Sequence, residues 1–166
     1  MNPFAELIAT MARVGYMRPG PGTWGSAAAV PLFWILHETL GVPGVLIGTV
    51  VMFIAGLWAT GEMTRGMDNH DPSEIVIDEL VGMWIALIPV SIGSAMAGAP
   101  STALWPAWPT AFTAFRLFDI WKPGPIGWAD RRGDALGVML DDVIAGVFAA
   151  IVVVVMAGLY HGVLMR

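Results

Sequence analysis

Residues 141–160 read DDVIAGVFAAIVVVVMAGLY, in which two adjacent carboxylates precede the most hydrophobic segment of the chain. A helix needs about 20 apolar residues to cross the hydrocarbon core of a bilayer, so residues 143–160 predict a membrane-spanning helix. The helix dipole accounts for one acid at its start. Asp141 and Asp142 together at a membrane surface are costly unless a cation or hydrogen-bond donors meet them. This stretch therefore predicts a membrane fold with a charged site at its edge.

Four other apolar segments accompany this one, and a hydrophobic content of 57% over 166 residues favours a bilayer over water. They cover residues 27–36, 45–60, 81–97 and 102–115, and the first and last are short for a complete crossing. Residues 3–13 have the spacing of a short amphipathic helix at an interface. We expect an all-α, polytopic membrane helical bundle of four to five transmembrane segments, five preferred, with a short N-terminal interfacial helix, in a single domain over residues 1–166.

The charged residues fall on one side of the membrane if the chain crosses it five times. Residues 1–25, 61–80 and 116–142 then share a side, which holds every basic residue except Arg166 and every acid except Glu38. The positive-inside rule makes that side cytoplasmic. His37 falls on the opposite side, and we interpret it as an interfacial residue.

Two acidic clusters occupy the predicted cytoplasmic side. Asp71 and Pro72 suit the start of a helix that continues into the third span, and on that helix Glu74 and Asp78 would share a face. The chain has no cysteine, so a metal would bind through oxygen or imidazole and would be a hard cation. We expect Asp78, Glu79, Asp141 and Asp142 to hold one or two Mg²⁺ ions. The simpler interpretation is a solvated acidic helix start.

Basic and glycine-rich elements on the same side indicate an anionic, phosphate-bearing substrate. Lys122 precedes a proline, which biases it away from helix. Arg116 and Asp119 are three residues apart and either pair with each other or contact substrate, with neither reading preferred. The glycines around Thr23 and Ser26 are able to expose backbone N–H groups to a phosphate. The catalytic candidates are Glu74, Asp78, Glu79, Asp141 and Asp142, and the substrate-binding candidates are Thr23, Ser26, Arg116, Asp119 and Lys122.

Other functions are less consistent with this pattern. The basic residues form no run and are outnumbered by acids, which argues against nucleic-acid binding. A small transporter is the main alternative, and only Pro106 and Pro109 within a span favour it. A transporter would place polar groups near the bilayer midplane, whereas here they gather at one membrane surface. Another metal-dependent phospholipid-modifying enzyme is a further alternative. A scaffold would not need so many acids at one membrane surface.

Four segments resemble the phosphatidylglycerophosphatase A family in the family's order: GTWGS (22–26), DPSEIVIDELVG (71–82), FRLFDIWKPGPIGWADR (115–131) and GVMLDDVIAG (137–146). The resemblance implies a Mg²⁺-dependent lipid phosphatase of the bacterial inner membrane, with its active site on the cytoplasmic face. The implied substrate is phosphatidylglycerophosphate, converted to phosphatidylglycerol among the membrane lipids. Asp134 departs from the pattern, since a glycine or another small residue is expected there. The residues leave the attacking group open between a water activated by a base such as Glu74 and a carboxylate, and they leave the oligomeric state open.

Overall fold

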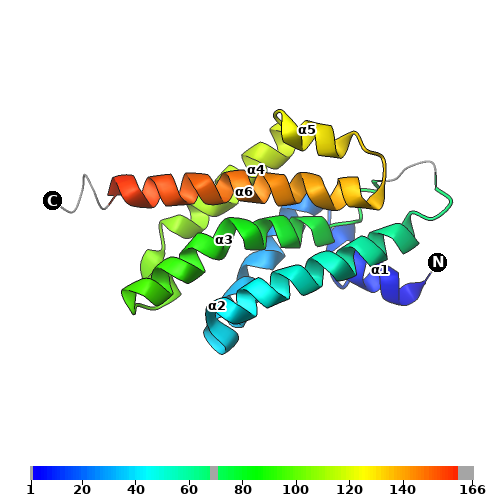
Figure 1. Ribbon diagram of the computed structural model, residues 1–166. Coiled ribbons are helices and arrows are strands. Elements are labelled where there is room, and N and C mark those ends of the chain that lie inside the picture. Colours follow the sequence, from blue (N-terminus) through cyan, green and yellow to red (C-terminus); the bar gives the residue numbers. More distant parts are fainter. Residues whose placement is uncertain (1, 68–70, 161–166) are drawn as a thin grey trace.

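The computed structural model describes residues 2–67 and 71–160, and these residues form helices and turns without a strand (Figure 1). The all-α prediction is therefore confirmed. His70 and Arg166 lie outside the described residues. The elements in chain order are α1 (Pro3–Ala9), the 3₁₀ turn η1 (Val14–Tyr16), α2 (Pro21–Met63), α3 (Ile77–Ala97), the 3₁₀ turn η2 (Ser101–Leu104), α4 (Ala107–Trp121), α5 (Pro125–Asp130) and α6 (Ala135–Leu159).

Three helices are long and apolar enough to cross a membrane, namely α2, α3 and α6, which is fewer than the four to five expected. The difference has two causes. The first two predicted segments form one element, α2, which is broken at Gly41, where φ is 62° and ψ is −160°. The fourth segment forms α4, whose 15 residues reach only about 22 Å.

The break at Gly41 divides α2 into a first arm, residues 21–40, and a second arm, residues 42–63. A positive φ of this kind is readily adopted by glycine, which carries no Cβ. Figure 1 shows the chain turning back at this point, so that both far ends of the arms lie at the same end of the molecule. The turn predicted from the glycine and proline residues after Leu40 is thus present as a sharp reversal within one long element.

Two local boundaries differ from those predicted. The N-terminal helix ends at Ala9 rather than at residue 13, because the backbone takes positive φ from Met11 to Arg13. Helix α3 begins at Ile77 rather than at Asp71 or Pro72. The N–H of Val76 donates to the carbonyl of Ala9 at 2.9 Å. This hydrogen bond joins the segment before α3 to the end of α1, and the helix begins at the next residue.

The prolines of the fourth segment do not break a helix in the membrane. Pro106 occupies the N-cap position of α4, and Pro109 lies in its first turn. Backbone N–H groups of a first turn have no partner within the helix, so proline is tolerated there. The feature that favoured a transporter therefore has a simple structural role at a helix start.

Helix α3 lies at the centre of the bundle and packs against α2, α4 and α6. It approaches α6 most closely where two glycines meet, because a Cβ on Gly146 would lie 2.4 Å from the carbonyl oxygen of Gly82. A buried hydrogen bond of 2.9 Å from Trp84 Nε1 to the carbonyl of Ala29 joins α3 to the first arm of α2. Close backbone contact of this kind is typical of membrane helices. It places the start of α3 beside the first turns of α6.

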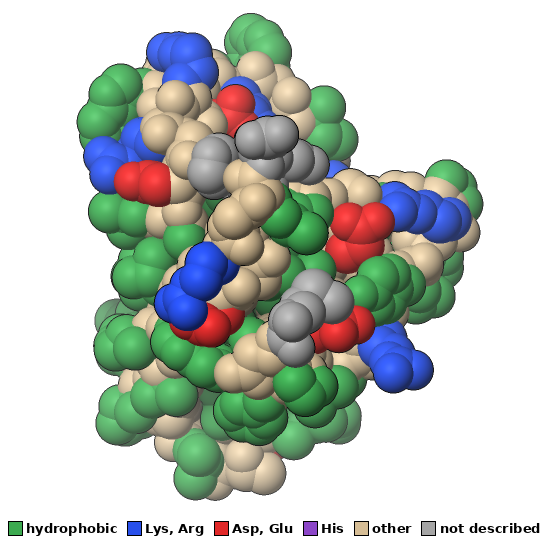
Figure 2. Space-filling model, turned by 90° about the vertical axis from the view of Figure 1, so that its right-hand side faces the viewer, with side chains coloured by type: hydrophobic (Ala, Val, Ile, Leu, Met, Phe, Trp, Pro, Cys, Tyr) green, Lys and Arg blue, Asp and Glu red, His purple; other side chains and the backbone are tan. Residues whose placement is uncertain are grey.

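Charged side chains gather at the end of the bundle where α1, α5 and the start of α6 lie (Figures 1 and 2). Figure 2 looks onto this end and shows acidic and basic side chains grouped around it, with hydrophobic side chains covering the flanks. The described helices thus present an apolar surface along their length and a polar surface at one end. That distribution fits membrane association through the apolar helices.

Candidate active site

Two acidic pairs form the centre of the charged end. Asp78 and Glu79 lie in the first turn of α3, and Asp141 and Asp142 lie in the second turn of α6. All four are buried, with exposed fractions from 3% to 8%. The two pairs have the same local geometry, because in each the first acid accepts the backbone N–H of the second at 2.9 Å. Four carboxylates from distant parts of the sequence are therefore held away from water.

Arg116 joins three elements around Glu79. Its Nη1 atom donates to both carboxylate oxygens of Glu79 at 2.6 Å and pairs with Asp119 at 2.8 Å. The hydroxyl of Ser26, from the first arm of α2, donates to Glu79 Oε2 at 2.7 Å. Gly22 permits this close approach: a Cβ there would lie 2.1 Å from Glu79 Oε1 and would displace that carboxylate from Arg116. The glycine-rich first turns of α2 thus pack against a carboxylate.

Lys122 supplies the second cation of the site. It is the C-cap of α4, where it adopts a left-handed backbone with φ of 48°, and this turns the chain toward α5. Its ammonium donates to Asp141 at 2.7 Å and also to Asp130. Burial opposes the charge on Lys122, but the hydrogen bonds to Asp130 and Asp141 outweigh it and raise the pKa of the lysine. Lys122 is therefore fully charged at neutral pH.

Glu79, Asp119 and Asp142 form a group of carboxylates suited to a metal ion. One oxygen of each lies within 4.8 Å of the others. Asp142 Oδ2 is buried and has no hydrogen-bond partner among the described residues. An unpaired carboxylate oxygen in an apolar setting is costly, and a cation would remove that cost. The donors are all hard oxygens, so the group fits Mg²⁺ or a similar divalent cation.

The structure distributes the sequence-predicted residues unevenly around this group. Arg116 and Ser26 contact members of this group directly. Asp78 and Asp141 precede two of its members in sequence and accept their backbone N–H groups, and Lys122 pairs with Asp141. Asp119, predicted to contact substrate, is instead one of the three grouped carboxylates. The residues that remain outside this group are Glu74 and Thr23.

Glu74 precedes α3, so it does not share a helical face with Asp78 as predicted. Its carboxylate pairs with Arg18 at 2.8 Å. Thr23 is exposed in the first turn of α2. Asp130 was not predicted as a site residue. Its position eight residues after Lys122 carries no helical signal, because a turn separates α4 from α5.

Asp134, the residue that departs from the family pattern, has a local structural role. It is the N-cap of α6, and its side chain accepts the backbone N–H of Gly137 at 2.7 Å. It also pairs with Arg132 at 2.9 Å. The hydrogen bonds from Arg132 and from the Gly137 N–H lower the pKa of Asp134. A helix cap explains this acid without any part in the site.

Comparison with known proteins identifies relatives over nearly the whole chain. The family model described as Phosphatidylglycerophosphatase A matches residues 7–157. A phosphatidylglycerophosphatase A from Haemophilus influenzae is 40% identical over 154 residues, which cover 92% of this chain and 88% of that protein. One from Escherichia coli is 40% identical over 152 residues, or 90% of this chain and 80% of that protein.

A further relative is named for a different activity. A protein from Bacteroides thetaiotaomicron, provisionally named a phosphatidylinositol-3-phosphatase, is 36% identical over 155 residues, which cover 90% of this chain and 91% of that protein. No solved structure matches the chain.

Proposed function

Since the chain belongs to the phosphatidylglycerophosphatase A family of phosphatases, we propose that it hydrolyses phosphatidylglycerophosphate to phosphatidylglycerol and phosphate, with Mg²⁺ as cofactor. The observation that carries this proposal is the buried group of Glu79, Asp119 and Asp142 with its unpaired Asp142 oxygen. A divalent metal would balance the negative charge of these acids, and the bound metal would in turn attract a phosphate.

Glu79, Asp119 and Asp142 would hold the metal, with Asp78 and Asp141 beside them. The metal supplies a Lewis acid that neutralises the charge of the phosphomonoester. One ion or two would satisfy this donor set.

The basic residues have distinct tasks in this proposal. Lys122 is partly exposed, with 29% of its side chain accessible, so its ammonium can bind phosphate oxygens that arrive from outside. Arg116 is more enclosed, with 15% accessible, and it orients Glu79 and Asp119 toward the same point. Glu74 stays a predicted base. Its ion pair with Arg18 would have to open before it took a proton from water.

We extend the proposal to the topology. Both arms of α2 and the helices α3, α4 and α6 would each cross the bilayer, which gives five crossings. The charged end would then face the cytoplasm of the inner membrane, because the basic residues of the described chain gather there. In this arrangement the phosphate sits at the charged end while the acyl chains remain among the apolar helices.

Phosphate release from purified protein in detergent tests the proposal. Three substrates separate the possibilities: phosphatidylglycerophosphate, phosphatidylinositol-3-phosphate and glycerol-3-phosphate. We expect release from phosphatidylglycerophosphate that stops with EDTA and returns with added Mg²⁺. Preference for phosphatidylinositol-3-phosphate would move the headgroup assignment toward that of the Bacteroides relative. Absence of release from all three would contradict the enzyme, and since no vesicle is present, a transporter would give that result.

A further inference from the structure

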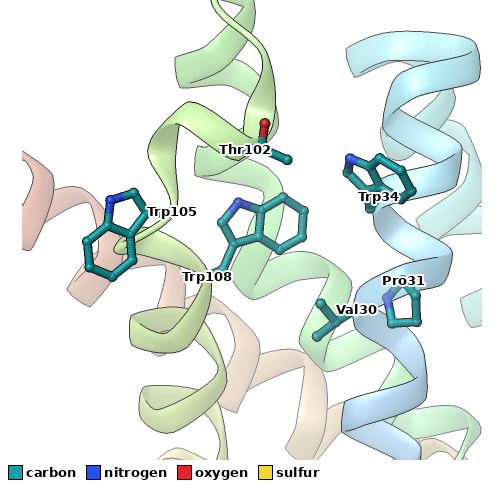
Figure 3. A pocket seen from close by; sticks show the side chains of 6 residues that line it. All are labelled: Val30, Pro31, Trp34, Thr102, Trp105 and Trp108. Carbon is teal, nitrogen blue, oxygen red and sulfur yellow. The ribbon is translucent and has the colours of Figure 1, made fainter.

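An apolar groove lies between the first arm of α2 and the start of α4, on the side of the bundle away from the charged end. Its volume is about 350 Å³, within the range of about 300–1,000 Å³ for ligand pockets. Figure 3 shows Trp34 and Trp108 facing each other across it, with Thr102 at one end. The residues that line the groove are Val30, Pro31, Trp34, Thr102, Trp105 and Trp108.

The wall formed by Trp108 is fixed in place. Its ring packs edge-on against Phe33 with centroids 6.0 Å apart. Its Nε1 donates to the carbonyl of Ser101 at 3.1 Å. A tryptophan held on two sides keeps a constant shape toward the groove, so the groove is a built feature of the fold rather than a gap between loose side chains.

The groove lies on the same two helices that carry Ser26 and Arg116, farther from the charged end. Val30 lies one helical turn, or about 6 Å, beyond Ser26 on the first arm of α2. Trp108 lies eight residues before Arg116, or about 12 Å along α4. One leaflet of a bilayer has a hydrocarbon depth of about 15 Å. A lipid whose phosphate is at the site therefore has its acyl chains at the level of this groove.

We propose that the groove binds one acyl chain of the lipid substrate, so that Val30, Trp34 and Trp108 determine which chain lengths are hydrolysed efficiently. This rests on the proposed lipid phosphatase activity. The lining is almost wholly apolar, which suits methylene groups and excludes a headgroup. The acyl chain would hold the substrate in the orientation that presents its phosphate to Lys122.

The kinetic test fills the groove and compares two substrates. Val30→Trp should lower kcat/KM for dioleoyl phosphatidylglycerophosphate by about tenfold, mainly through KM, because a filled apolar pocket rejects the chain. The loss should be much smaller for the dihexanoyl substrate, since a lipid with six-carbon chains gains little of its binding from the groove. Ile54→Trp, on the exposed apolar face of the second arm, is the matched control and should change neither. Equal loss on both substrates, or no loss on either, would overturn the proposal.

A second measurement does not require catalysis or a tolerated tryptophan at position 30. Phosphatidylglycerophosphate with a diazirine near the end of one acyl chain is cross-linked to the wild-type protein in EDTA, and the adducts are mapped by mass spectrometry. We expect adducts on Trp34 and Trp108, reduced in Trp34→Ala. Equal labelling by phosphatidylethanolamine with the same chain would assign the groove to bulk lipid and refute the proposal. If wild type labels the groove but releases no phosphate, only the proposed activity fails.

Discussion

The two ends of the molecule differ in how their polar side chains are paired. At the end away from the site, His37 contacts Ser91 at 2.8 Å and Ser94 at 3.2 Å, and Glu38 accepts a hydrogen bond from Ser101 at 2.9 Å. These groups pair with small hydroxyls. At the charged end, carboxylates lie close together, and Asp142 Oδ2 is buried without a hydrogen-bond partner in the described part of the chain.

The difference distinguishes polar groups that join helices from polar groups that are expected to bind a ligand. Polar groups that only join helices are matched locally, because an unmatched buried group lowers stability. Groups that act on a ligand are matched only when the ligand is present. The serine contacts of His37 therefore join α2 to α3, and the carboxylates at the opposite end are the proposed site.

The largest expected effect comes from replacing one acid at each end by its amide. Asp142→Asn should lower phosphate release by about a hundred- to a thousandfold, because it removes a charged ligand from the site. Its thermal stability in detergent should stay the same or rise, since a repelled, unpaired carboxylate is lost. Glu38→Gln is the matched control and should keep its activity, because the amide can still accept from Ser101.

The comparison of the ends fails if these two variants behave alike. An Asp142→Asn variant that keeps its activity, with melting temperature unchanged, would remove Asp142 from the site. A Glu38→Gln variant that loses activity without unfolding would show that the far end takes part in the reaction.

Sequence patterns revealed the charged end because each acid there contradicts its surroundings. Asp141 and Asp142 precede the most apolar helix, and Asp78 and Glu79 adjoin another apolar run. That contrast is local and can be read from the chain. The membership of Asp119 in the carboxylate group is not local, because it depends on how α4 packs beside α3 and α6.

The predicted helix start before Glu74 and the predicted separation of the first two segments differ from the structure for similar reasons. The helix start near Pro72 followed from reliable cap preferences, but a hydrogen bond between Val76 and Ala9 overrides them. Such a contact joins residues that are far apart in sequence. The glycine and proline residues after Leu40 indicated a turn. They did not indicate that both arms belong to one long element, because that depends on the backbone angles of Gly41 alone.

A smaller effect is expected from removing the contacts of His37 with Ser91 and Ser94. His37→Ala should lower the free energy of unfolding by about 2 kcal/mol, because the hydroxyl of Ser91 is left buried without this partner. The activity per folded molecule should be unchanged. Thermal unfolding in detergent and phosphate release from the folded fraction measure the two quantities.

The double variant His37→Ala, Ser91→Ala isolates the unmatched hydroxyl. It should be more stable than His37→Ala alone, since both partners are then absent. Equal stability of the two variants would mean that packing of the histidine ring, rather than its hydrogen bonds, joins the helices.

The smallest expected effect concerns Asp134, an acid of the charged end that already has a hydrogen bond and an ion pair. Asp134→Ala should lower the free energy of unfolding by about 1 kcal/mol through loss of the N-cap of α6. Its effect on phosphate release should be negligible, unlike that of Asp142→Asn two turns later in the same helix. Asp134→Asn should keep most of the stability, because an asparagine side chain also accepts the Gly137 N–H.

Arg132→Gln distinguishes the cap from the ion pair. An exposed ion pair contributes little, so this variant should be nearly as stable as wild type. If Asp134→Asn and Arg132→Gln both lose as much as Asp134→Ala, the ion pair and not the cap stabilises the start of α6. If Asp134→Asn instead folds normally and loses phosphate release, Asp134 belongs to the site, and the division between matched and unmatched acids at this end is wrong.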